Sequence, residues 1–496
     1  MSQSRGVTRR AFLEASAALS VAPLVARGPG VFQATGFKLS EPTSKGVVVW
    51  TRVTRNAERT PDTAPLPIVR LFDRETGAAV QIRNNATYAN ARSVVEFAPG
   101  TDWSSIRGAA AGAPGQTRVR YRPTGDSRWK LTDWRNVDPS KDFTAHIALD
   151  DLKPGTPYEV TVEARVGPEA TDVDAVSGGF TTAPEGSANA RVSFAVMSCQ
   201  EYDHRDRPDG FSIYPSMLKT RPGFLVNTGD ALYYDHGAIP AVTLELARYH
   251  WARMFGYGTL RDFHTQVGSY FMKDDHDTLA DDTWPGSRSG EFSFEDGVSV
   301  FHEQTALTQS EYRTVRWGRH LQVWMVEGRN FRTRRPGEDP TIWGPEQLAW
   351  VERTMKGSDA TFKVLITQTP IVGPDRPSKD DNYANAGFAK EGAAIRRFLH
   401  EQENLSVITG DRHWQYVSVD EVTQLEEWSV GPASDAHAGG WDESAPRVQH
   451  RFLRINGGGF LSGEVRPTAQ GATLTLRLHD TAGHVVFEDT KTAARR

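Results

Sequence analysis

The sequence predicts a multi-domain protein in which an antiparallel β-sandwich is followed by a layered α/β domain. Residues from about 35 to 183 contain short, alternating or β-branched runs that are typical of strands. Residues 177–190 are rich in Gly, Ser, Ala and Pro, which indicates a boundary. After Arg191, apolar runs alternate with segments of helical periodicity, the pattern of an α/β domain.

The N-terminus, residues 1–30, has the layout of a twin-arginine signal peptide. Arg9 and Arg10 precede Phe12 and Leu13, and a run of mostly small and apolar residues follows. The alternative is an amphipathic helix of the mature fold. No other stretch approaches the ~20 apolar residues of a transmembrane helix. We therefore expect the twin-arginine machinery to export the chain to the periplasm or the cell exterior, without a membrane-spanning segment.

Residues 31–186 are predicted to form the sandwich, of the fibronectin III or immunoglobulin type. The run GVVVWTRV at 46–53 is rich in β-branched residues, and a Pro-Gly turn at 154–155 joins two further strands. In the second of these, residues 157–165, apolar and polar residues alternate with the period of a half-buried strand. The Trp-rich stretch near 100–140 suggests an insertion, to which the sequence assigns no role.

Residues 190–496 are predicted to form the α/β domain. The strand candidates are nearly continuous apolar runs, which indicates sheets covered on both faces. Residues 344–356 and 389–403 place their apolar side chains on one helical face each. Residues 472–480 and 484–489 alternate again and are expected to add strands to this domain.

Several apolar runs of this domain end in residues that bind metals or phosphate. In α/β sheets, ligands bind outside the carboxyl ends of the strands. A single acid at such a place is usually a turn residue or a helix cap. Five strand ends of this kind are harder to explain by turn or capping preferences alone. The residues concerned are Cys199, Asp230, Asp274, Asp275, His276, Asp277, Glu327, Arg329, Asp411 and His413.

The residue types indicate metal ions. Carboxylates crowded at 274–277 repel one another unless a cation lies among them, although a solvated acidic loop is the alternative. Tyr233 follows Asp230 by three residues, and a phenol with a pKa near 10 ligates only a highly charged ion such as Fe³⁺. Cys199 is the single cysteine, so it is either a small core residue or a ligating thiol. Arg329 and Arg332 are candidates for binding phosphoryl oxygens. The alternative is that they are surface charges or form an ion pair with Glu327.

The overall charge indicates whether nucleic acid is an expected partner. The net charge is −5 and no block of Lys or Arg suggests a phosphate-backbone footprint, so a charge-driven nucleic-acid partner is not expected.

Six motifs occur in the order SFAVMSCQ, GDALYY, DDHD, EGRNFR, GPEQLAWV and GDRHWQYVSVD. This ordered set resembles the PhoD-like alkaline phosphatase family of the calcineurin-like metallophosphoesterases, whose catalytic domain has two β-sheets flanked by helices. The resemblance implies an Fe³⁺ ion on Cys199, Asp230, Tyr233 and His413. It implies a second ion, Ca²⁺ or alternatively Mn, Mg or Zn, on Asp230, Asp275 and Asp411. His276 and Arg329 would be the catalytic residues, one protonating the leaving oxygen and one steadying the phosphoryl group.

The chain departs from the family pattern at a few positions. Asp277 stands where the family has Glu, Glu327 and Gly328 where Asp and Thr are common, and Tyr383 where His is expected in a subgroup. These departures concern the second metal.

The resemblance implies an exported hydrolase of phosphate monoesters or diesters, with a small molecule or a polymer as substrate. Two alternatives stay open: hydrolysis of a non-phosphate ester by the same metals, and a secreted sandwich protein that binds surface glycans around a relict metal site.

Overall fold

The computed structural model describes residues 30–494 except 308–309, 374, 377–378 and 442–448. Val31–Arg496 form one compact unit. The predicted signal peptide lies outside the described residues, apart from Gly30. In the part of the chain that is described, no helix combines the length and the hydropathy needed to cross a bilayer.

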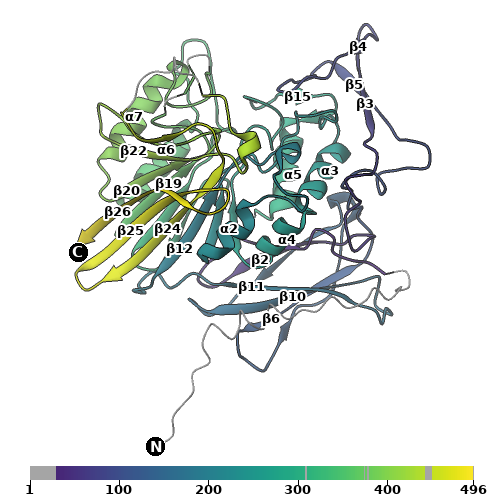
Figure 1. Cartoon of the computed structure of the whole chain (residues 1–496), viewed down its shortest axis with the longest axis horizontal. Coiled ribbons are helices and arrows are strands. Elements are labelled where there is room, and N and C mark those ends of the chain that lie inside the picture. Colours follow the sequence, from purple (N-terminus) through teal and green to yellow (C-terminus); the bar gives the residue numbers. More distant parts are fainter. Residues whose placement is uncertain (1–29, 308–309, 374, 377–378, 442–448, 495–496) are drawn as a thin grey trace, which may run out of the picture. The chain divides into compact units, whose positions relative to one another are not determined.

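Two large sheets form the centre of the unit (Figure 1). The first has nine strands, in the order β26 (Val485–Ala494), β25 (Gly471–Asp480), β24 (Gly459–Thr468), β12 (Val192–Met197), β13 (Phe224–Asn227), β14 (Gly268–Phe271), β1 (Phe37–Ser40), β2 (Val47–Arg52) and β9 (Thr144–Leu149). The second has seven, in the order β17 (Arg313–Trp317), β18 (Leu321–Met325), β19 (Phe362–Thr367), β20 (Leu405–Thr409), β22 (Glu426–Val430), β21 (Gln415–Val419) and β23 (Gln449–Arg454). The tail strands β25 and β26 join the first sheet, as the sequence predicts.

The side chains of each central strand point to two different cores. Phe194 and Val196 of β12 pack in one buried cluster with Val323 and Val364 of the second sheet, so the two sheets face each other. Ala195, on the opposite face of β12, belongs to the cluster that the helices cover. Burial on both faces explains why these strands are continuous apolar runs in the sequence.

Helices cover the outer faces of both sheets (Figure 1). Residues of α6 (Gly344–Lys356) and α7 (Ala389–His400) pack against the second sheet. On the first sheet the helices are α2 (Ile213–Thr220), α3 (Leu244–Phe255), α4 (Gly258–His264) and α5 (Phe294–Thr305). The prediction of two apolar-faced helices near 344 and 389 is therefore confirmed, with α7 ending a few residues earlier than expected.

The N-terminal strands do not form a separate sheet pair, because three of them extend the nine-stranded sheet. β1 pairs in parallel with β14, and β2 and β9 follow at the edge. A further sheet faces them across a shared core, in the order β11 (Asp174–Thr181), β10 (Pro157–Arg165), β6 (Gln116–Pro123) and β7 (Lys130–Leu131), with β8 (Arg135–Asn136) also on β6. The predicted domain boundary at 186–190 stays a prediction.

The continuous sheet has a local reason. Val47 and Val49 of β2 belong to the core shared with β10, whereas Trp50 points the other way and donates a hydrogen bond to the Glu303 carbonyl of α5. Because both faces of β2 are covered, this strand can belong to a sheet that has helices on one face and a second sheet on the other.

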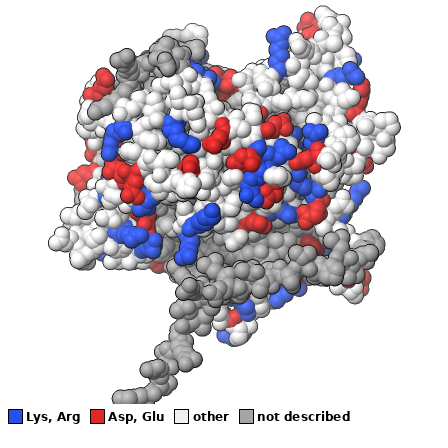
Figure 2. Space-filling model, in the orientation of Figure 1, with Lys and Arg blue, Asp and Glu red and all other residues white. Residues whose placement is uncertain are grey.

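Small strands complete the unit: β3 (Ile68–Asp73) with β4 (Ala79–Val80) and β5 (Ala91–Glu96), and the pair β15 (Arg288–Ser289) and β16 (Phe292–Ser293). On the face in Figure 2, basic and acidic side chains are intermixed over the described surface.

Candidate metal centre

The predicted site residues lie in loops that follow parallel strands. β12, β13 and β14 run parallel in the first sheet, and β18, β19 and β20 in the second. Cys199, Asp230 and Asp274 come after the first three, and Glu327 and Asp411 after β18 and β20. The carboxyl ends of two facing sheets therefore supply all the candidate ligands.

Three of these loops hold a non-glycine residue in the left-handed backbone region. The φ angles are 52° at Cys199, 52° at Asp230 and 60° at Asp411. Such backbone costs of order 1–3 kcal/mol per residue and concentrates at functional sites. It turns each ligand side chain out of the strand direction and toward the centre.

Gly229 allows two of the loops to pass close together. A Cβ on Gly229 would lie 2.6 Å from the Asp274 Cβ and 2.9 Å from the Asp274 backbone nitrogen. Its φ of +115° also disfavours any side chain. Only glycine before Asp230 therefore brings that carboxylate beside the loop after β14.

One cluster contains sulfur, phenol, carboxylate and imidazole. The Cys199 Sγ lies 3.4 Å from the Asp230 Oδ2, and the Tyr233 hydroxyl lies 3.2 Å from that oxygen. The hydroxyl is also 3.1 Å from the His413 Nε2. Ligand atoms of Cys199, Asp230 and His413 all lie within 4.8 Å of one another. The structure thus brings together the four residues that the sequence analysis groups on the first metal.

The second cluster contains only carboxylates. Asp230, Asp274 and Asp411 have oxygens within 4.8 Å of one another. Asp275, the residue expected there, belongs to a neighbouring group with Asp230 and His276. Its Oδ2 accepts a hydrogen bond from the Asp282 backbone N–H at 2.7 Å. From the sequence, Asp274 is among the strand-end residues but Asp275 is assigned to the second ion, because two adjacent acids at a strand end cannot be ranked without their orientation.

The donor set fits cations on two independent grounds. The Asp230 Oδ1 and the Asp274 Oδ2 are buried and have no hydrogen-bond partner among the described residues. An ionised oxygen left in this state is strongly unfavourable. Burial raises the pKa of Asp230 well above its usual value and that of Asp274 to about 6, with the neighbouring carboxylates adding to both effects. Cations between the carboxylates remove both penalties.

The chemistry of the first cluster is compatible with a cation as well. Burial, and then the Asp230 charge, raise the pKa of the Cys199 thiol well above its usual value. A thiol in that environment ionises when a metal coordinates it. Burial lowers the pKa of His413 well below its usual value, which leaves the neutral imidazole that metals bind.

His276 lies beside both clusters and is held by a carboxylate. Its Nδ1 is 2.7 Å from the Asp235 Oδ1, and its ring centroid is 4.2 Å from that of Tyr233. Burial lowers the pKa of His276, but the charges of Asp235 and Asp275 outweigh burial and raise it well above the usual value. The two carboxylates thus favour the imidazolium form of His276, which has a proton to donate.

Arg329 forms ion pairs with carboxylates of the site. Its side chain is fully buried, and its Nε donates to the Asp274 Oδ1 at 2.5 Å. Its Nη2 lies 3.3 Å from the Asp275 Oδ2 and 3.7 Å from the Asp381 Oδ2. The guanidinium orients and neutralises the carboxylates from behind, so its contact with phosphoryl oxygens stays a prediction.

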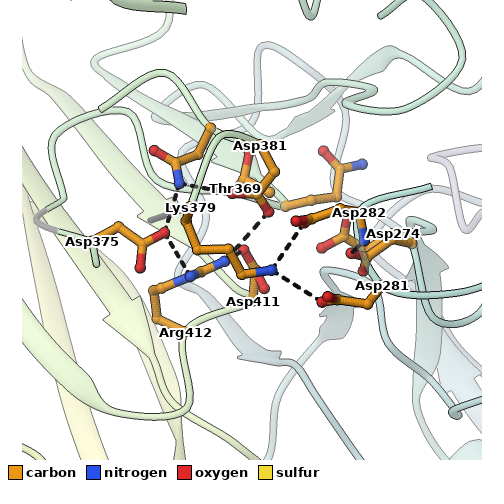
Figure 3. Close-up of polar contacts among 12 residues, drawn as sticks. Asp274, Asp281, Asp282, Thr369, Asp375, Lys379, Asp381, Asp411 and Arg412 are labelled. Carbon is orange, nitrogen blue, oxygen red and sulfur yellow. Dashed lines mark hydrogen bonds and ion pairs between the residues drawn. The ribbon is translucent and has the colours of Figure 1, made fainter. Parts of the chain in front are cut away.

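A loop after β19 adds a second layer of charges (Figure 3). Lys379 lies between Asp281 and Asp282, with Nζ–Oδ1 distances of 3.0 and 2.9 Å. Arg412 lies 2.6 Å from the Asp375 Oδ2 and 3.6 Å from the Asp381 Oδ2. The only sequence signal for these contacts is the run KDDN, which is indistinguishable from a solvated loop.

Two facing sheets flanked by helices, with Cys, Asp, Tyr and His side chains converging at their carboxyl ends, define the chain as a metallophosphoesterase. Residues 194–434 match the family described as PhoD-like phosphatase. This match confirms the family resemblance seen in the sequence, and the chain is a phosphoric ester hydrolase.

Solved structures show the same fold. The structure of PhoD is 16% identical with a TM-score of 0.66, over 95% of this chain and 92% of that one. The structure of the purple acid phosphatase PPD1 from yellow lupin (Lupinus luteus) seeds is 10% identical with a TM-score of 0.57, over 93% of this chain and 95% of that one. A search of curated proteins found no match.

Proposed function

We propose that the chain is an exported phosphatase or phosphodiesterase that hydrolyses phosphate monoesters, diesters or both. The observation that carries this proposal is the convergence of Cys199, Asp230, Tyr233 and His413 beside a carboxylate cluster with unpartnered buried oxygens. The twin-arginine pattern at residues 1–30 supports export to the periplasm or the cell exterior.

Cys199, Asp230, Tyr233 and His413 would hold Fe³⁺, since thiolate and phenolate favour a trivalent ion. Asp230, Asp274 and Asp411, with Asp275 nearby, would hold Ca²⁺ or a similar hard cation such as Mn²⁺ or Mg²⁺, with Zn²⁺ as a further alternative. When bound, the two ions supply Lewis acidity toward the phosphoryl oxygens and the attacking water.

The proton for the leaving group would come from His276. The Nδ1 contact with Asp235 fixes the ring and leaves the Nε2–H for the ester oxygen. His276 is 7% exposed, so the imidazolium is shielded from bulk water while it lies beside the candidate ligands Asp230 and Asp275. Arg329, bound to Asp274, would keep the carboxylates ionised when substrate adds further negative charge.

Elemental analysis of the purified protein tests the metal assignment, with Cys199→Ala as the variant. We expect about one iron per chain with calcium in the wild type, and loss of iron in the variant. An unchanged iron content in Cys199→Ala would remove Cys199 from the site.

A pair of chromogenic substrates, p-nitrophenyl phosphate and bis(p-nitrophenyl) phosphate, tests the reaction. Hydrolysis of either one by the metal-loaded protein supports the proposal and shows which ester class is preferred. Failure on both, with hydrolysis of p-nitrophenyl acetate, would favour the carboxylic ester alternative. Failure on all three would favour the glycan-binding alternative.

A further inference from the structure

We propose that Glu201, His204 and His437 form a separate metal site, suited to Zn²⁺, next to the centre described above. The three side chains offer one carboxylate oxygen and two imidazole nitrogens within 4.8 Å of one another. This donor set is typical of zinc, and the proposal does not depend on the function proposed for the neighbouring centre.

Local structure brings the first two ligands to the same side. Tyr202–His204 form a 3₁₀-helix (η2) that begins directly after Glu201. Side chains at positions i and i+3 eclipse one another in a 3₁₀-helix, so Glu201 and His204 project in the same direction. His437 ends a second 3₁₀-helix, η4 (Asp435–His437), and reaches the same point from the other sheet's loops.

The orientation of the side chains, more than their distances, leaves a place for a metal. The Glu201 Oε2 lies 2.7 Å from the His204 Nδ1 and 3.3 Å from the His437 Nε2. Yet the Glu201 Oε2 and the His204 Nδ1 are both buried atoms without a hydrogen bond of acceptable geometry. Tetrahedral zinc with bonds of about 2.1 Å places neighbouring ligand atoms about 3.4 Å apart. The Glu201–His437 distance already matches this value, and zinc would widen the Glu201–His204 contact.

The hydrogen bond on the far side of His437 assigns its donor atom. The His437 Nδ1 lies 3.1 Å from the Cys199 carbonyl oxygen, which only accepts, so the Nδ1 carries the hydrogen. In the neutral ring, the Nε2 then presents a lone pair to the Glu201 Oε2, which is also an acceptor. A cation between the two atoms removes their mutual repulsion. Metal-bound histidines characteristically donate their other N–H to a backbone carbonyl in this way.

The remaining contacts complete a metal site. The Glu201 side chain is 8% exposed, and its Oε1 is 3.0 Å from the His236 Nδ1, which fixes the carboxylate orientation. The His204 side chain is 43% exposed, which leaves a path for the ion and room for a water as fourth ligand.

The site is coupled to the neighbouring centre through His437. Its ring centroid is 4.0 Å from that of His413, and its Nδ1–H holds the backbone of Cys199. Zinc on His437 would therefore rigidify the loop that carries Cys199.

Zinc stoichiometry measured on the iron-loaded protein tests the proposal. After dialysis against excess Zn²⁺ and desalting, we expect the wild type to retain one zinc that His204→Ala and Glu201→Gln lose, with their iron unchanged. The matched control is His302→Ala, since His302 also pairs with a carboxylate, Glu311, at 3.2 Å, and is similarly exposed, at 34%. The control should keep its zinc.

X-ray absorption at the zinc edge distinguishes this site from the Cys199 cluster, and the loss of zinc in His204→Ala distinguishes it from the carboxylate cluster. Zinc on Glu201, His204 and His437 has a shell of nitrogen and oxygen only, whereas zinc on Cys199 shows a sulfur at about 2.3 Å. A sulfur shell, zinc retained in His204→Ala, or no retained zinc in the wild type would each overturn the proposal. None of these readouts depends on phosphatase activity.

Discussion

The metal centre and the loop that lies over it both concentrate charge, but they balance it differently. In the loop network, Asp375 and Asp381 lie beside Arg412, and Lys379 pairs with Asp281 and Asp282 (Figure 3). In the centre, the Asp230 Oδ1 and the Asp274 Oδ2 have no partner among the described side chains. The carboxylates of the loop network thus find cationic partners within the chain, whereas two carboxylate oxygens of the centre have no hydrogen-bond partner there. The two regions meet where Arg412 contacts Asp411.

This difference separates two kinds of residue. Removing a ligand from the centre should abolish metal binding and activity, with a smaller effect on folding. Removing the buried Arg412 from the loop network should destabilise the fold, because it leaves buried carboxylates uncompensated. The predictions below test this separation.

The largest effect is expected for Asp230→Asn, which removes the carboxylate shared by both clusters. Loss of both ions should lower kcat by on the order of 10⁴-fold or more. Iron and calcium contents and kcat on the better chromogenic substrate measure it. A variant that keeps both metals would contradict the bridging role.

His276→Ala should lower kcat by about 10²–10⁴-fold while both metals stay bound. The loss should be smaller for p-nitrophenyl esters than for alkyl esters, because a good leaving group needs little protonation. Equal losses on both ester types would argue against a proton-donor role.

The pH profile sharpens the assignment of His276. Because Asp235 raises the pKa of His276, activity that needs the imidazolium should fall on the alkaline side as this group loses its proton. Asp235→Asn should shift that alkaline limb to lower pH. A limb that stays in place would show that another group controls it.

Arg412→Met tests the loop network. It removes a fully buried guanidinium that faces Asp375, Asp381 and the candidate ligand Asp411, and should cost about 3–5 kcal/mol of unfolding free energy. Denaturant unfolding measures it. A cost near that of an exposed substitution would mean that the aspartates are compensated elsewhere.

Lys379→Met should have the smallest effect, below about 1 kcal/mol, because its partners Asp281 and Asp282 are partly exposed and solvent screens the pairs. The same unfolding measurement compares it directly with Arg412→Met. Similar costs for the two variants would remove the distinction between buried and screened pairs.

The sequence by itself determined the strand ends and the candidate ligands that follow them. Hydrophobic periodicity, turn residues and the order of the motifs place Cys199, Asp230, Tyr233 and His413 after apolar strands. The structure brings these four side chains together. The α/β alternation after Arg191 and the helices near 344 and 389 are equally local properties, because hydrophobic periodicity reports which residues a strand or helix buries.

Only the tertiary structure decided the rest. It turns Asp274 toward Asp230, buries Arg329 behind the carboxylates, joins β1 to β14, and brings His437 to Glu201. Each depends on a backbone turn or on packing between distant segments. Local sequence specifies which side chain is available, whereas the direction it takes and the partner it meets depend on how the sheets pack.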